Sequence, residues 1–550
     1  MASFSVPENR FDKLTTGKIS EILPENTLKT FVPQEEVARV IKPVPSRYRN
    51  EIAKYIVHRN LNCRRCGKCA EVCQYGVHVL KPGYKYFGEP KNHLCIGPAC
   101  EKNSSTSSPQ GGNFCVAKCP QGALQLKENP LYKALGDFRW PGDLILATWK
   151  MAETGDVPPA EYGYEYECGN SGGGFDRLRF KFPDKPPVKI DADKIDTSIL
   201  LNKRGDGRPE IRIDVPWYGG GMSFGSVSNV TQLSKARAAK AWNTFTCTGE
   251  GGYMERMRPY DDHVITQVAT GLFGVREETI QRVPIVEFKY AQGAKPGLGG
   301  HLLGDKNTPA VAKMREAVLG ISLFSPFPFH SVYSIEDHQK HIDWIKHVNR
   351  RALISTKVST PTDVDMVAVG SYSAGTHIVH IDGGYGGTGA APDIAKKNIA
   401  MPIEYAIGRV HKFLADEGVR DKVTLIASGG IRSAHDAAKA IALGADGVVI
   451  GTAELVALGC VRCSRCESGR GCPRGIATTD VELSKKMTIE WGTQRLINLY
   501  NAWRKVLVGI LQRFGMRSVT ELRGRTDLLM HLDYTNAPST SSGQGVGAKK

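Results

Sequence analysis

The cysteines are the residues whose spacing points most directly to chemistry. Twelve of the fourteen gather in three sets, while Cys168 and Cys247 stand apart and are interpreted as buried structural thiols. Four cysteines within a short stretch can hold either a structural zinc ion or a redox cluster of iron and sulfur. The sets are Cys63, Cys66, Cys69 and Cys73; Cys95, Cys100, Cys115 and Cys119; and Cys460, Cys463, Cys466 and Cys472.

The first set has the spacing of bacterial ferredoxins. CRRCGKCAEVC is a C-x2-C-x2-C-x3-C run, and the second set ends in C-x3-C-P. In two-cluster ferredoxins the fourth cysteine of each run binds the other cluster. Cys119 is therefore expected to join the first three cysteines, and Cys73 to join the second set. A pair of zinc sites is the alternative, which the C-x3-C-P ending and the symmetry of the sets disfavour.

Glycines after two buried strands suggest a phosphate site. Gly429-Gly430 follows KVTLIAS, and Gly451-Thr452 follows DGVVIG. Glycine lets backbone amides approach a phosphate closely, and (β/α)8 barrels often bind phosphate after strands seven and eight. FMN is one such phosphate. Lys357, in ISTKVS, would point into the barrel and stabilise a reduced flavin, or else form a structural ion pair.

These residues need a barrel to position them. IRIDV, ALISTKV and THIVHID, with the two runs above, have the β-branched composition of buried parallel strands. SIEDHQKHIDWIKHVNR and SAHDAAKAIALG have helical patterns between them. Repeated strand-helix units predict an α/β fold, a (β/α)8 TIM barrel, with an open doubly wound sheet as the alternative.

Shifts in composition divide the chain into six segments. The expected order is an N-terminal extension (1–50), a ferredoxin-like α+β domain for two 4Fe-4S clusters (51–135), a connector (136–204), the FMN-binding barrel with an inserted iron-sulfur loop (205–482), C-terminal helices (483–535) and a disordered tail (536–550).

The formal charge of +16 does not by itself indicate nucleic acid. Three cubane clusters held by thiolates would remove about six positive charges, and no nucleic-acid motif is present. Neither a signal peptide nor an apolar run long enough to cross a membrane is found. We expect a cytoplasmic protein, whose cysteines serve metal or redox chemistry because that compartment keeps thiols reduced.

Several motifs resemble the synthase domain of glutamate synthase over roughly residues 205–480. They include GGGMSFGSVS, CTGEGG, QVATGLFGV, AQGAKPGLGGHLLG, YSIEDH and DGGYGGTGAAP. With the ferredoxin-like block in front, the chain resembles the compact archaeal-type subunit from about residue 55 to 535. The resemblance implies FMN, three iron-sulfur clusters, and hydride transfer to 2-iminoglutarate, formed from 2-oxoglutarate and ammonia, which gives glutamate.

The resemblance also implies roles for individual residues. Glu250 and Lys295 are expected to be catalytic, with Glu250 handling protons during imine formation. The oxo-acid is expected to lie among Thr270, Lys289, Gly293, Lys295, His301 and Arg315. Flavin contacts are expected from Met222, Ser223, Gly225, Gln267, Lys357, Gly383, Gly384, Gly429, Gly430, Gly451 and Thr452.

The third cysteine set departs from the family. The family carries C-x5-C-x4-C for a 3Fe-4S cluster, whereas this chain has C-x2-C-x2-C-x5-C with Cys463 as an additional residue. A fourth thiolate lets a cluster keep its fourth iron, so we expect 4Fe-4S, with 3Fe-4S as the alternative.

Leu298 and His301 replace a glutamate and a glutamine beside the oxo-acid pocket, so the amine can differ. An N-methylglutamate synthase-like enzyme, an electron-transfer subunit and a pyrimidine-type dehydrogenase remain alternatives. The family's N-terminal cysteine nucleophile and Gly-repeat β-helix are not found. Separate amidotransferase-like and β-helix subunits are therefore expected, with a ferredoxin or an NAD(P)H-oxidising protein as electron donor.

Overall fold

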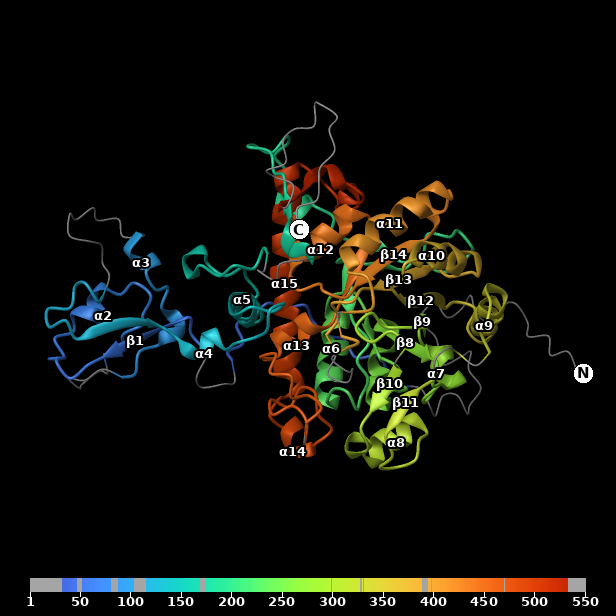
Figure 1. Cartoon of the computed structure of the whole chain (residues 1–550), viewed down its shortest axis with the longest axis horizontal. Coiled ribbons are helices and arrows are strands. Elements are labelled where there is room, and N and C mark those ends of the chain that lie inside the picture. Colours follow the sequence, from blue (N-terminus) through green and yellow to red (C-terminus); the bar gives the residue numbers. More distant parts are fainter. Residues whose placement is uncertain are drawn as a thin grey trace, which may run out of the picture.

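The structure is a computed structural model in which an N-terminal domain lies beside a barrel, with α5 (Gly142–Thr154) and α15 (Ile489–Phe514) between them (Figure 1). It describes residues 32–46, 52–80, 88–102, 115–168, 174–297, 299–326, 329, 331–387, 394–396, 398–468 and 470–532. The predicted disordered tail lies outside these residues.

Eight parallel strands close into a barrel, which confirms the predicted (β/α)8 fold and excludes the open sheet. Adjacent strands pair in register; Lys289, for example, lies opposite Lys357. In chain order, the strands are β6 (Trp217–Gly219), β7 (Thr246–Cys247), β8 (Val264–Ala269), β9 (Ile285–Lys289), β12 (Leu353–Ser359), β13 (Ile378–Asp382), β14 (Thr424–Ser428) and β15 (Gly447–Ile450).

Helices cover the outside of the barrel. Two of them begin as predicted: the hydroxyl of Ser334 accepts a hydrogen bond from Asp337 N at 3.2 Å, and that of Ser433 accepts one from Asp436 N at 3.3 Å. The helices that follow barrel strands are α6 (Asn229–Ala241), α7 (Glu277–Arg282), α9 (Ile335–Val348), α10 (Val364–Ser373), α11 (Ile403–Asp416), α12 (Ala434–Leu443) and α13 (Thr452–Ala457).

One predicted barrel strand was wrong. Within IRIDV, β5 (Arg212–Ile213) pairs antiparallel with β4 (Ile199–Leu200) outside the barrel. Arg212 is exposed and Ile213 is buried, so this run has one face in water, whereas barrel strands are covered on both faces. The first barrel strand is instead β6, whose Trp217 and Tyr218 are fully buried.

The N-terminal domain has a small core. β1 (Tyr55–Arg59) pairs antiparallel with β2 (Leu124–Glu128), and Val57, Cys69, Val77 and Leu124 pack together beneath them. The helices here are α2 (Lys68–Val72), η4 (Asn92–Leu94), α3 (Ala99–Lys102) and α4 (Pro130–Lys133). So few buried apolar residues provide little stability, which fits a domain held together by its cysteine ligands.

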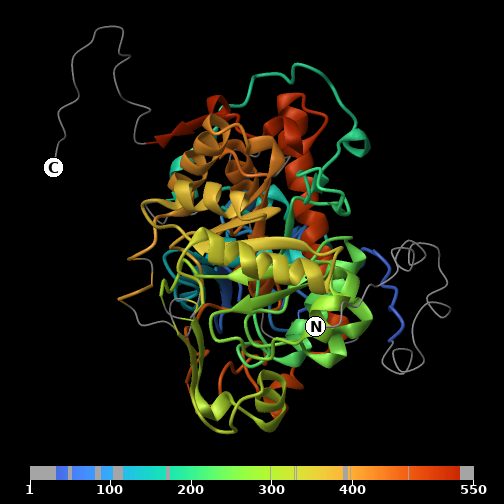
Figure 2. The same cartoon turned by 90° about the vertical axis from the view of Figure 1, so that its right-hand side faces the viewer.

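The long helix α15 packs against α5, α6 and α12 and stands beside the barrel in both views (Figures 1 and 2). The N-terminal segment 32–46 runs along it: Asn498 Nδ2 donates to Lys42 O at 2.9 Å and to Ala152 O at 3.1 Å. Trp217, Tyr500 and Trp503 fill the space between α15 and the barrel.

The remaining elements connect and border these parts. The C-terminal segment predicted to be helical ends in a strand instead, because β16 (Leu529–His531) pairs with β3 (Leu178–Phe180).

Among the described residues, no helix combines the length and apolar character needed to cross a membrane. The other elements are β10 (Gly299–Leu302), β11 (Leu323–Ser325), α8 (Pro309–Arg315), α14 (Val481–Ser484), and the 3-10 helices η5 (Ala160–Tyr162), η6 (Gly174–Arg177), η7 (Ala192–Lys194), η8 (Glu255–His263), η9 (Gly304–Lys306), η10 (Arg420–Lys422), η11 (Val519–Leu522) and η12 (Thr526–Leu528).

Candidate active site and cysteine clusters

A cavity of about 860 Å³ opens at the carboxyl ends of the barrel strands. Residues that follow the seventh and eighth strands, β14 and β15, form one end of it, where barrels commonly bind phosphate. Of the residues predicted to contact a flavin, six line this cavity: Met222, Lys357, Gly429, Gly430, Gly451 and Thr452.

Three further predicted glycines, Gly293, Gly383 and Gly384, do not line this cavity but allow close packing of the backbone around it. A Cβ at Gly293 would overlap the carbonyl oxygens of Asp382 and Gly383, and one at Gly384 would overlap Ala400 O. Gly429 has φ +91° and packs equally closely on Gly383. These positions need glycine because three strand ends approach one another without side chains between them.

A buried polar network crosses the barrel below this cavity. Gln267 Nε2 donates to Glu287 Oε1 at 2.6 Å, and Glu287 Oε2 lies 3.0 Å from His380 Nδ1. His380 Nε2 lies 2.7 Å from Ser428 Oγ, which donates to Asp382 Oδ1 at 2.5 Å. Lys357 Nζ, 3.5 Å from Asp382 Oδ2, ends the network at the cavity.

The network keeps its charges despite burial. Burial opposes ionisation of Glu287, yet His380, Lys357 and Gln267 lower its pKa to about 2. Burial likewise opposes a charge on Lys357, but Asp382 and Glu287 raise its pKa above the ordinary value. A protonated lysine therefore faces the cavity, where it can stabilise a developing negative charge.

Sequence reasoning did not identify Glu287, His380, Asp382 or Ser428. A signal was present, because IVEFK and IVHID place polar residues at alternate positions of otherwise apolar strands. In a barrel strand, alternate residues point to the same side, and in these two strands that side is the interior.

A smaller cavity of about 260 Å³ adjoins the first, since Gln292 lines both. Thr270 and Lys289, predicted around the oxo-acid, line it together with Glu250, predicted to be catalytic. Lys289 Nζ lies 2.8 Å from Glu250 Oε1 and donates to Gln292 Oε1 at 3.0 Å. The ammonium group of Lys289 and the carboxyl group of Glu250 are thus held together next to the larger cavity.

Two more buried cations lie beside Glu250. Burial, together with the charge of Lys289, lowers the pKa of Lys295 to about 8. Burial lowers the pKa of Arg315 to about 10, although Glu250 partly offsets it. Arg315 Nη2 donates to Ser223 Oγ at 2.8 Å, and its guanidinium also passes close to Gly225. Among the described residues, neither Nε nor Nη1 of Arg315 finds a hydrogen-bond partner.

His301 lies elsewhere. It is exposed on β10 and does not line either cavity, although Gly299 of the same strand lines the smaller one. Leu298, the other departure in this segment, is outside the described residues. The predicted contact between His301 and the oxo-acid therefore has no geometric support.

The first two cysteine sets group as the crossover predicts. Cys63, Cys66, Cys69 and Cys119 line one cavity of about 320 Å³. In the other group, burial and then the charges of Cys95, Cys73 and Cys100 raise the pKa of Cys115 to about 12. Among the described residues, no three His, Cys, Asp or Glu side chains converge closely enough to bind a single metal ion.

The third set lies against the larger cavity. Burial, followed by the thiols of Cys466 and Cys472, raises the pKa of Cys460 to about 11, while Cys463 is exposed. Arg462, between two of these cysteines, lines the larger cavity. The segment between β10 and α8 is attached here too, because Lys306 of η9 donates through Nζ to Cys466 O at 2.5 Å.

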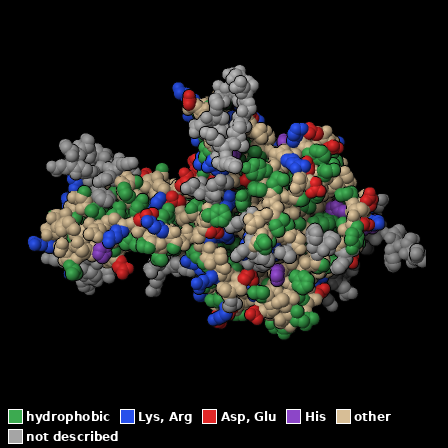
Figure 3. Space-filling view, viewed as in Figure 1, with side chains coloured by type: hydrophobic (Ala, Val, Ile, Leu, Met, Phe, Trp, Pro, Cys, Tyr) green, Lys and Arg blue, Asp and Glu red, His purple; other side chains and the backbone are tan. Residues whose placement is uncertain are grey.

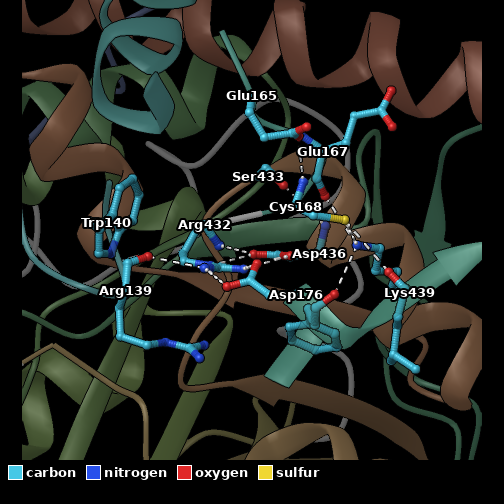
Figure 4. Close-up of polar contacts among 12 residues, drawn as sticks. Arg139, Trp140, Glu165, Glu167, Cys168, Asp176, Arg432, Ser433, Asp436 and Lys439 are labelled. Carbon is cyan, nitrogen blue, oxygen red and sulfur yellow. Dashed lines mark hydrogen bonds and ion pairs between the residues drawn. The ribbon is translucent and has the colours of Figure 1, made fainter. Parts of the chain in front are cut away.

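The two single cysteines are both buried. Cys247 lies on β7, where burial and the nearby Glu287 raise its pKa to about 12. Cys168 accepts a hydrogen bond from Lys439 Nζ at 3.1 Å (Figure 4), yet burial still raises its pKa. None of the fourteen cysteines, all of which the structure describes, forms a disulfide.

The surface is of mixed charge. On the face shown in Figure 3, basic side chains are interspersed with acidic ones and with hydrophobic ones. This face therefore lacks, among its described residues, the continuous basic stripe by which proteins bind nucleic acid.

Comparison with known proteins gives the family. A pattern described as a conserved region in glutamate synthase matches residues 177–517. The archaeal-type glutamate synthase (NADPH) of Thermotoga maritima is 34% identical over 501 residues, covering 86% of this chain and 94% of that protein. The archaeal enzyme (NADPH) of Methanocaldococcus jannaschii is 35% identical over 507 residues, covering 86% and 94%.

Two other similarities are more limited. The glutamate synthase (NADPH) large chain of Azospirillum brasilense is 36% identical over 316 residues, which cover 56% of this chain and 21% of that one. The flavin-binding domain of baker's yeast flavocytochrome b2 matches with a TM-score of 0.41 and 16% identity, over 76% of this chain and 84% of that domain. The family match over most of the barrel and the relatives matched along most of their length lead to one conclusion: the chain belongs to the glutamate synthase family.

Proposed function

We propose that this chain reduces 2-iminoglutarate, formed from 2-oxoglutarate and ammonia, to glutamate. Overall, 2-oxoglutarate, ammonia, two electrons and two protons give glutamate and water. The observation that supports this most is the group of three buried cations, Lys289, Lys295 and Arg315, around Glu250 and close to the cavity at the carboxyl ends of the barrel strands. A substrate with two carboxylates accounts for so many cations, and for the nitrogens of Arg315 that find no partner among the described residues.

FMN fits the larger cavity. A Cβ at Gly451 would meet no protein atom within 4 Å, so the backbone there is open to a ligand. Gly429, Gly430, Gly451 and Thr452 would hold the phosphate, and Lys357 and Met222 would lie along the ring system. Bound FMN would supply hydride transfer to the imine carbon.

Iron-sulfur clusters fit the cysteine groups. We propose one 4Fe-4S cluster on Cys63, Cys66, Cys69 and Cys119, and a second on Cys73, Cys95, Cys100 and Cys115. The third cysteine set would hold another, with Cys463 as its fourth ligand. Such clusters would supply one-electron transfer between a donor and the flavin.

The protein's own residues divide the work around the substrate. Lys289, Lys295 and Arg315 would bind and orient the two carboxylates. The carboxyl group of Glu250, held by Lys289, would exchange a proton with the amine as the imine forms and water leaves. Gln292, which lines both cavities, would align the imine carbon toward the larger one.

The partners are part of the proposal. The relatives' names specify NADPH, and we propose that an NAD(P)H-oxidising protein or a ferredoxin delivers electrons. Separate amidotransferase-like and β-helix subunits would supply ammonia. We place the protein in the cytoplasm, where reducing conditions keep cysteines out of disulfides and available as cluster ligands.

The test is a single-turnover experiment on the anaerobically reduced holoprotein. Mixing with 2-oxoglutarate and isotopically labelled ammonia should reoxidise the flavin and give labelled glutamate, identified by mass spectrometry. A parallel sample receives methylamine, because the departures at Leu298 and His301 leave the amine open. Formation of N-methylglutamate alone would identify methylamine, and not ammonia, as the amine that the enzyme uses. Absence of a product from either amine would refute the proposal.

A further inference from the structure

A turn outside the barrel forms part of the wall of the larger cavity. Residues 137–140 precede α5 and lie outside the 177–517 region conserved in glutamate synthase. Arg139 and Trp140 of this turn nevertheless line the cavity, together with Gly429 and Gly430 of the barrel. The connector and the barrel loops therefore line the same cavity.

The backbone of this turn is held from two sides. Asp137 Oδ1 accepts hydrogen bonds from the amides of Arg139 and Trp140, each at 2.9 Å. Asp137 Oδ2 accepts two from Arg462, at 3.1 and 2.8 Å. On the opposite side, Arg432 Nη1 donates to the carbonyl of Arg139 at 3.1 Å (Figure 4). The position of Arg139 is thus fixed by the turn itself, by the loop that carries the third cysteine set (the third cysteine loop) and by the loop after β14.

The acidic groups near Arg139 are engaged by another arginine. Arg432 donates to Asp176 at 2.9 and 2.5 Å and to Asp436 at 2.9 Å. Figure 4 shows the guanidinium of Arg139 directed away from this group. Glu404, a buried carboxyl group that also interacts with Arg139, is the remaining acid nearby.

The guanidinium of Arg139 lies at the predicted phosphate end of the cavity. Its carbon atom sits 4.0 Å from the ring centre of Tyr385, and the side chain is 4% exposed. A Cβ at Gly430, whose φ is +120°, would lie 3.5 Å from Arg139 Nη2. The side chain is therefore beside the glycine pair whose amides would meet a phosphate.

We propose that Arg139 binds the phosphate of the flavin mononucleotide, so that the connector and the barrel complete one binding site. The inference rests on the proposed function, because it takes FMN as the ligand. A guanidinium can donate two parallel hydrogen bonds to a phosphate. Stacking on Tyr385 orients the plane of the Arg139 guanidinium for this contact. Arg139 is thus a specificity residue for the phosphorylated form of the flavin.

The experiment compares FMN with riboflavin, which lacks the phosphate. Flavin is removed from the cluster-containing protein, and each flavin is titrated back while its fluorescence quenching is followed. Arg139→Gln should weaken FMN binding roughly 10- to 100-fold, the loss expected for a charged hydrogen bond, and leave riboflavin binding unchanged. Arg139→Lys, which keeps the charge but loses the planar fork, should fall between the wild type and Arg139→Gln.

Arg179→Gln is the matched control. Its guanidinium donates to Asp176 O at 2.8 Å in the same connector and does not line the cavity, so affinity for both flavins should persist. Equal loss of FMN and riboflavin in both Arg139 variants, or no loss in either, would overturn the inference while leaving the proposed function intact. A wild-type protein that binds neither flavin would instead refute the proposed function.

Discussion

Lys295 shows how burial can set the working pH of a binding residue. Its side chain is 5% exposed, and burial together with Lys289 lowers its pKa to about 8. Below that pH the ammonium is charged and attracts a dicarboxylate; above it the charge is lost. The neighbouring positive charges favour binding of a dianion. The same charges repel one another, so each cation loses its proton more easily.

We therefore expect 2-oxoglutarate to bind more weakly as the pH rises through about 8. The dissociation constant, followed through the flavin spectrum between pH 6.5 and 9.5 on the oxidised protein, should rise by up to about tenfold per pH unit once Lys295 is neutral. Lys295→Gln is neutral throughout, so its binding should be weak and lack this dependence. Retention of the wild-type profile in Lys295→Gln would assign the titration to another group.

Glu250 provides a prediction about chemistry at the residue scale. Glu250→Gln keeps the shape of the side chain but removes the charge that pairs with Lys289. General acid-base groups contribute roughly 10²- to 10⁴-fold, so flavin reoxidation by 2-oxoglutarate and ammonia should slow by that factor. Reduction of the flavin by dithionite should proceed normally. A variant with the wild-type reoxidation rate would exclude Glu250 from proton transfer.

At the scale of elements, the third cysteine loop joins two functions. Arg462 donates to Asp137 and lines the flavin cavity, while the cysteines on either side of it, Cys460 and Cys463, are proposed cluster ligands. Arg462 itself has φ +59°, an uncommon backbone conformation for a residue with a side chain. With the proposed cluster bound, the loop would bring a redox group and a guanidinium to the same wall of the larger cavity.

Replacing Cys463 tests the additional ligand of this loop. In Cys463→Ala, the cluster should lose one iron and show the EPR signal of an oxidised 3Fe-4S centre, whereas the anaerobically oxidised wild type should lack that signal. Cys168→Ala is the control, because Cys168 is buried against Lys439 and belongs to none of the three sets. A 3Fe signal in wild type that added iron does not diminish would contradict the assignment.

At the scale of the whole molecule, one buried aspartate holds distant segments together. Asp446 lies between Lys203 ahead of the barrel, at 2.5 Å, Arg420 at 3.0 Å and Arg523 beyond α15, at 3.1 Å. Burial alone would raise the pKa of Asp446, but these three cations bring it below the usual range. The ionised form is therefore what stabilises the fold, and this contribution is lost as the pH falls toward that lowered pKa.

Asp446→Asn should lower the free energy of unfolding by about 3–5 kcal/mol, because the buried Arg420 and the partly buried Lys203 and Arg523 lose their counter-charge. The shift in the urea midpoint of intrinsic tryptophan fluorescence measures it. Asp421→Asn is the control: Asp421 pairs with the same Arg523 at 2.6 Å, but its side chain is 82% exposed, so the loss should stay below about 1 kcal/mol. Equal shifts in the two variants would contradict this role of Asp446.

The sequence allowed the barrel, its phosphate loops and the grouping of the cysteines to be predicted, because each depends on spacing along the chain. IRIDV was misassigned, since a run of apolar and polar residues does not reveal whether one or both faces are covered. The network of Glu287 and His380 could not be placed before the strands were known to close. Arg139 carries no motif, and only the packing of the connector against β14 brings it to the cavity.

The composite wall of the flavin cavity has a consequence for how the protein matures. One part of that wall is the turn at Asp137, which directly follows the N-terminal cysteine domain, and another is Arg462 between two cysteines. The loop of Arg462 would take shape only when iron and sulfide are inserted, and the turn is anchored to that loop through Asp137. Cofactor loading would then have an order in which the clusters come first and the flavin last, so cells starved of iron should accumulate a chain that also lacks its yellow colour.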